Sequence, residues 1–125
     1  MGARVDVTPA AAELMRSLRG RHGPLMFHQS GGCCDGSSPM CYPDGDLIIA
    51  EGADVHLGDL DVGLERVIPV YMSTAQYEYW KHTHITIDVV KGRGSGFSVE
   101  APDGVRFLIR SRLLSADESY ELGLV

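Results

Sequence analysis

The sequence contains no run of 18 or more apolar residues, and it has a deficit of basic side chains. The first absence argues against a membrane span. The second follows from 11 Lys and Arg residues against 17 Asp and Glu residues, a formal net charge of −6 with His neutral. A basic phosphate-binding surface is therefore not expected, and we expect neither a nucleic-acid partner nor a membrane partner.

The N-terminal segment also lacks the apolar stretch of an export signal, because Asp6 interrupts it. We therefore expect a cytoplasmic protein. The 125 residues, 44% of them hydrophobic, suit one globular domain and argue against disorder. We expect a single domain over residues 1–125, with a tail from about residue 115.

The sequence has only three cysteines, and all of them lie in one short stretch: Cys33, Cys34 and Cys41. An odd number cannot pair completely, and a reducing compartment favours free thiols. The stretch from His28 to Cys41 is rich in Gly, Pro and small polar residues, which predicts an irregular loop. Thiolates are soft metal ligands, so this loop is a candidate metal site. The alternative is that small residues simply fill a tight loop.

The spacing of the cysteines is not that of a zinc finger, so a metal would need further ligands. His28 precedes Cys33 by five residues, and His82 and His84 would project from the same face of an extended segment. The alternative for this pair is the solvated face of a strand. His22 and His56 are expected at the surface. A nucleophilic cysteine with a histidine base is a further hypothesis, and it is weakened by the acidic Asp35 beside Cys34.

Hydrophobic periodicity predicts a helix over residues 9–19, with Thr8 as its N-cap and Gly20 after its end. A second short helix is predicted from Ser73 to Trp80. Short strands are predicted at 24–29, 46–50, 54–57, 66–71 and 83–90, with a hairpin formed by 97–100 and 105–110. Pro69 indicates an edge strand or a bulge. Residues 92–96 are predicted to form a turn rather than a nucleotide-binding loop. The sum is an α+β, mostly β domain.

Two groups of side chains are candidates for an interaction surface. The predicted second helix is too short to bury three large rings on one side, and three arginines fall on one face of the last strand. Core packing and a solvated face are the alternatives. We also expect a homo-oligomer, specifically a dimer. The candidate interaction residues are Tyr77, Tyr79, Trp80, Arg106, Arg110 and Arg112.

Two segments resemble the HesB-like, A-type iron–sulfur carriers. One is Val7-Thr-Pro-Ala-Ala-Ala-Glu-Leu followed by Gly31-Gly-Cys-Cys-Asp-Gly36, and the other is Asp88-Val-Val90 followed by Gly94-Ser-Gly-Phe97 and Pro102. Those carriers end in a Cys-Gly-Cys that supplies further cluster ligands. No cysteine lies beyond Cys41 in this sequence, so only Cys33 matches a carrier ligand by position.

Three longer stretches, residues 23–43, 78–83 and 106–113, resemble a small bacterial family of unknown function whose genes often lie beside aldehyde dehydrogenase genes. That resemblance implies a HesB-like, β-rich compact fold and service to an aldehyde dehydrogenase.

These observations lead to one main hypothesis and two alternatives. The main hypothesis is a cytosolic accessory protein that binds zinc or iron, rather than an iron–sulfur cluster, through Cys33, Cys34, Cys41, His28, His82 and His84. The alternatives are a metal-free partner of an aldehyde dehydrogenase, acting through the interaction residues above, and a thiol-dependent enzyme. No catalytic residue is assigned, and the sequence favours a protein that is not an enzyme.

Overall fold

A computed structural model describes residues 5–29, 39–45, 49, 53–80, 82–92 and 98–121, with Tyr79 and Glu121 described by their backbone only. Within these residues the elements, in chain order, are β1 (Val5–Val7), α1 (Pro9–His22), β2 (Leu25–Gln29), β3 (Met40–Pro43), β4 (Asp54–Leu60), β5 (Ile68–Ser73), α2 (Thr74–Trp80), β6 (Thr83–Lys91), η1 (Ala101–Asp103), β7 (Val105–Leu113) and α3 (Ala116–Glu121).

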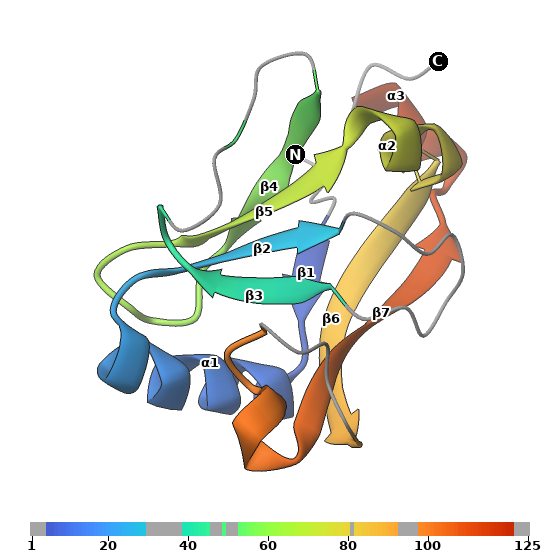
Figure 1. The fold of residues 1–125 in the computed structure, drawn as a ribbon. Helices are drawn as coiled ribbons and strands as arrows, with labels where there is room; N and C mark the ends of the chain where they lie inside the picture. Colours follow the sequence, from blue (N-terminus) through green and yellow to red (C-terminus); the bar gives the residue numbers. More distant parts are fainter. Residues whose placement is uncertain are drawn as a thin grey trace.

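The strands form two mixed sheets (Figure 1). One has the order β1-β6-β7, in which β1 is parallel and β7 antiparallel to the central strand β6. The other has the order β3-β2-β5-β4, in which only β2 and β5 are parallel. The predicted α+β, mostly β class is thereby confirmed.

The two sheets share one hydrophobic core. In β5 the buried residues Ile68, Val70 and Met72 alternate with partly exposed ones, as expected when one face of a strand is covered. Phe27 of β2 meets Phe107 of β7 edge-to-face, with ring centroids 5.0 Å apart and planes at 83°. This contact joins the two sheets directly.

Helix α1 begins as predicted but continues further. The Thr8 side chain accepts the Ala11 N–H, and Pro9 occupies the first turn. The helix runs through Gly20 and ends before Gly23, which has φ = 80° and donates its N–H to the Arg19 carbonyl. The stop predicted at Gly20 was therefore wrong, and the second glycine supplies it, because its conformation is one that glycine tolerates best. Figure 1 shows α1 below the β2–β3 pair and next to β6.

Three other expectations need correction. Cys41 lies in strand β3 rather than in a loop, because Met40–Pro43 pairs with β2. The last hairpin is formed by β6 and β7, and residues 98–100 are in turns. Pro69 lies in β5, which is an interior strand rather than the expected edge strand, and it precedes the residues of β5 that pair with β2. The nearby bulge is in the partner strand β4, between His56 and Gly58.

Some expected features lie elsewhere or outside the described residues. The strand expected at 46–50 lies outside the described residues except for Ile49, and so does most of the turn expected at 92–96. The segment expected as a tail contains α3. None of the helices in the described ranges is long and apolar enough to cross a membrane.

Candidate functional site

His28 and Asp54 form a shielded pair beside the cysteine-rich segment. His28 lies in β2 opposite Met40 of β3, so it stands at the end of the strand pair that flanks residues 30–38. Its Nε2 lies 2.6 Å from Oδ1 of Asp54, and the two side chains are 7% and 13% exposed. An ionised carboxylate can only accept a hydrogen bond, so this contact needs a proton on His28 Nε2.

Cys41 is separated from His28 by the sheet itself. It is paired with Phe27 and belongs to the core, whereas His28 is one residue further along β2 and projects from the opposite face. Burial, aided by the nearby Glu100 carboxylate, raises the pKa of the Cys41 thiol well above its ordinary value. A thiol held neutral in this way is a poor metal ligand.

Around Cys41 a buried polar cluster ties β3 to the segment before β7. The Cys41 N–H donates to Ser98 Oγ at 2.9 Å, and the Cys41 carbonyl accepts the Val99 N–H at 3.0 Å. The Ser98 hydroxyl donates to the Glu100 carboxylate, which also accepts the Phe107 N–H at 3.2 Å. The cluster gives a buried carboxylate two donors and has a structural role.

His82 and His84 do not act as a pair. His82 lies in the turn before β6 and is exposed, whereas His84 is buried within the strand. Burial and the Arg112 charge lower the pKa of His84, against smaller opposing effects of Asp6 and Glu118. His84 also projects from the face of its sheet opposite the core residues Ile85 and Ile87. His28 and His84 therefore lie on the outer faces of two different sheets.

The structure does not bring the predicted metal ligands together among the residues that it describes. Within the described ranges no group of three or more His, Cys, Asp or Glu side chains is placed to hold a metal ion. Cys33 and Cys34 lie outside the described residues. Of the predicted histidine ligands, His28 is the nearest to Cys33 and Cys34 along the chain, and it is paired with Asp54.

The predicted interaction arginines are engaged within the chain. Arg110 Nε donates to Asp88 at 2.7 Å, and Asp88 also accepts the Thr8 hydroxyl at 2.8 Å. These hydrogen bonds, the Arg110 bond foremost and a Val89 N–H bond among them, lower the pKa of Asp88. Arg106 lies on the same face of β7, opposite Val90 of β6.

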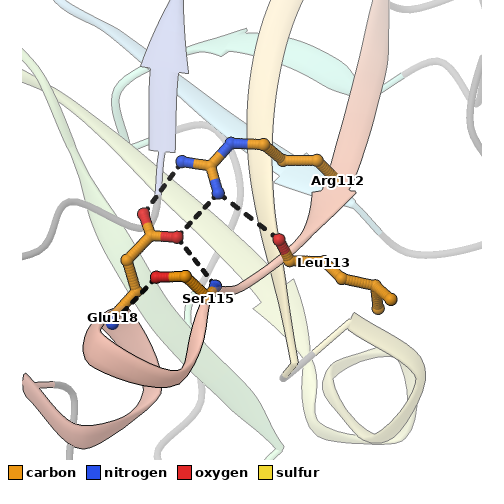
Figure 2. Close-up of polar contacts among 4 residues, drawn as sticks. All are labelled: Arg112, Leu113, Ser115 and Glu118. Carbon is orange, nitrogen blue, oxygen red and sulfur yellow. Dashed lines mark hydrogen bonds and ion pairs between the residues drawn. The ribbon is translucent and has the colours of Figure 1, made fainter.

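Arg112 holds the C-terminal helix α3 in place, as Figure 2 shows. Its two terminal nitrogens donate to the two Glu118 oxygens at 2.7 and 2.8 Å. Glu118 also accepts the Ser115 N–H, and Ser115 Oγ accepts the Glu118 N–H, which is a capping box. The Arg112 bonds in particular lower the pKa of Glu118 to about 2. The Ser115-x-x-Glu118 spacing was the signal in the sequence for this helix.

The aromatic candidates are placed differently from one another. Trp80 is 2% exposed and belongs to the core, with Nε1 donating to Gln76 Oε1 at 3.4 Å. Tyr77 is partly buried against the same core, and the Tyr79 side chain lies outside the described residues.

A row of polar side chains on the outer face of the four-stranded sheet was not predicted from the sequence. Tyr71 of β5 pairs with His28 of β2 on one side and with His56 of β4 on the other. The rings of His56 and Tyr71 are tilted against each other, with centroids 5.2 Å apart, and His56 Nε2 lies 2.7 Å from Asp59 Oδ1. No local pattern predicts this row, because it depends on the register of strands that are distant in sequence.

A family model described as Domain of unknown function (DUF779) matches residues 14–113. No curated protein matches the sequence.

Proposed function

The chain belongs to the DUF779 family, and we propose that it is a cytoplasmic metal-binding accessory protein. The proposed metal site is formed by Cys33, Cys34 and His28. Zinc or iron is the proposed metal, because thiolate and imidazole together suit both. Cys41 is left out of this ligand set, since it lies in the core with a neutral thiol.

The observation that carries the proposal is the His28–Asp54 pair. Metal-bound histidines commonly donate their second ring N–H to a carboxylate, which fixes the tautomer and makes the ligating nitrogen more basic. The 2.6 Å contact between His28 Nε2 and Asp54 Oδ1 is of this kind, and in the proposed site Nδ1 would be the ligating atom. Burial of the pair also favours one fixed orientation of the ring.

The test is the metal content of untagged protein, measured by mass spectrometry after growth with added iron or zinc. Cys33→Ser and Cys34→Ser should abolish stoichiometric metal, and His28→Gln should reduce it strongly. Asp54→Asn should weaken affinity by about 10–100-fold, as expected for an outer carboxylate. Cys41→Ser is the matched control and should keep the metal. Metal-free wild-type protein under every growth condition, or a Cys33→Ser variant with undiminished metal, would refute the proposal.

The accessory role is proposed from the resemblance to proteins encoded beside aldehyde dehydrogenases. The partner is then an aldehyde dehydrogenase, and the protein acts on it without catalysing a reaction itself. Co-purification of the two proteins, with the activity and solubility of the enzyme measured with and without this chain, tests it. Absence of both binding and effect would contradict the partner, and it would leave the metal proposal to stand on its own measurement.

A further inference from the structure

An open cavity of about 380 Å³ lies on the outer face of the four-stranded sheet, beyond the His28–Asp54 pair. Its lining includes Val67, just before β5, and the alternate residues Pro69 and Tyr71 of that strand. One wall comes from β4, with His56 and Asp59, and the other from Asp44 and Arg66. The volume is at the lower end of the range for small-molecule sites.

The charges in this cavity do not balance when His56 is neutral. Arg66 Nη2 donates to Asp44 Oδ2 at 3.1 Å, so this acid is matched by a cation. Asp59 is matched only by the imidazole of His56, at 2.7 Å, among the described residues that line the cavity. One guanidinium against two carboxylates leaves a formal charge of −1. The chain as a whole carries −6, which adds to the attraction of a cation.

The rest of the lining suits a ligand that is both cationic and apolar. Val67, 48% exposed, and Pro69 both line the cavity and give it apolar surface. The Tyr71 ring also lines it, in contact with the His56 ring, and aromatic faces attract ammonium groups. Asp59, at 42% side-chain exposure, remains open to a solute.

We propose that this cavity binds a monovalent organic ammonium, a primary amine on a short apolar chain. The ammonium group pairs with the Asp59 carboxylate, beside the contacting rings of His56 and Tyr71. The chain of the ligand covers Pro69 and Val67. This site is separate from the metal site proposed above and uses none of its ligands.

The test compares two probes of equal shape and opposite charge, n-butylammonium and butyrate, titrated into the full chain at constant ionic strength and followed by NMR. Butylammonium should bind in the millimolar range. Asp59→Asn should weaken it about three- to fivefold, since an exposed ion pair contributes up to about 1 kcal/mol. Tyr71→Leu should weaken it by a similar factor, because the leucine keeps apolar area and removes the ring.

The sign of the effect at Arg66 distinguishes the two ligand classes. Arg66→Gln frees Asp44 from its cation, so it should tighten butylammonium binding. It would instead abolish the binding of a carboxylate. Arg19→Gln is the matched control, because Arg19 pairs with the exposed Glu65 and does not line the cavity.

Butyrate binding without butylammonium binding would overturn the proposal. So would weaker butylammonium binding in Arg66→Gln, or no binding of either probe to the wild-type chain. The metal content of Asp59→Asn should equal that of the wild type, so failure here is distinguishable from failure of the metal proposal. Each variant is checked for an unchanged unfolding midpoint, because all four substitutions lie at exposed or partly exposed positions.

Discussion

Replacing Gly58 by alanine should destabilise the protein through a single contact. A Cβ at this position would lie 2.8 Å from Val5 Cγ2, whereas the other two Val5 carbons near it are at 3.9 and 4.0 Å, ordinary contact distances. Val5 is β-branched and 7% exposed, so its methyl group cannot turn aside freely. Overpacking of this kind costs about 1–3 kcal/mol. Alanine also lowers the conformational entropy of the unfolded chain, which offsets about 0.4–1 kcal/mol of that cost. The net expected loss is about 0–2.6 kcal/mol, with a middle value of about 1.3 kcal/mol.

A double-mutant cycle isolates this contact. Val5→Ala alone should cost about 2 kcal/mol, because it removes two buried methyl groups. In the Val5→Ala background, Gly58→Ala should be neutral or slightly stabilising, since the clashing methyl is gone. Urea unfolding of the four proteins gives the free energies, with equal m-values as the condition for comparing them. Gly20→Ala, where nothing lies within 4 Å of the added Cβ, should stabilise α1 by about 0.5–1 kcal/mol.

The refuting result is equal destabilisation by Gly58→Ala in both backgrounds. That outcome would mean that the loss arises from the backbone of β4 rather than from Val5. It would also mean that β1 does not approach β4 as closely as the structure places it.

Three further predictions follow from buried or paired groups. Cys41 should resist alkylation in the native protein and react only on unfolding, as read from labelled peptides; labelling at the rate of a free thiol would contradict its burial. The only tryptophan, Trp80, should emit at short wavelength and be shielded from iodide, and Trp80→Ala should cost about 3–5 kcal/mol in urea unfolding. Because the pKa of Glu118 is lowered to about 2, the ionised Glu118 carboxylate stabilises the docked α3 at pH values above the ordinary carboxyl pKa. This stabilisation should be lost as the pH falls from about 4.3 through 2. Arg112→Gln should return the NMR titration of the Glu118 carboxyl toward its ordinary range, and an unchanged titration would show that Arg112 is not the cause.

Features set by neighbours in the sequence were predicted well. The start of α1 follows from Thr8 and Pro9, and β6 follows from the alternation of Ile85, Ile87 and Val89. The end of α1 was placed too early because two glycines, Gly20 and Gly23, compete for the stop, and only the backbone geometry shows which one takes the positive φ.

Features set by strand register could not be predicted. The sequence places His28 and Cys41 in one stretch, yet their pairing partners put them on opposite faces of a sheet. Conversely, His28 and His56 are distant in sequence and become neighbours across Tyr71. A shift of one residue in any of these pairings would reverse the result, and local patterns contain no information about it.

The parallel pairing of β1 with β6 also has a consequence for biosynthesis. Val5 lies opposite Ile85, so β1 is synthesised 85 − 5 = 80 residues before its partner in β6. At about 5–20 residues per second, that is a wait of about 4–16 s. During this time residues 5–7 have no sheet to join, and the neighbouring helix α1 lacks the Thr8–Asp88 hydrogen bond that fastens its start. The three-stranded sheet is therefore completed late, only after β7, which ends at Leu113, has also been synthesised.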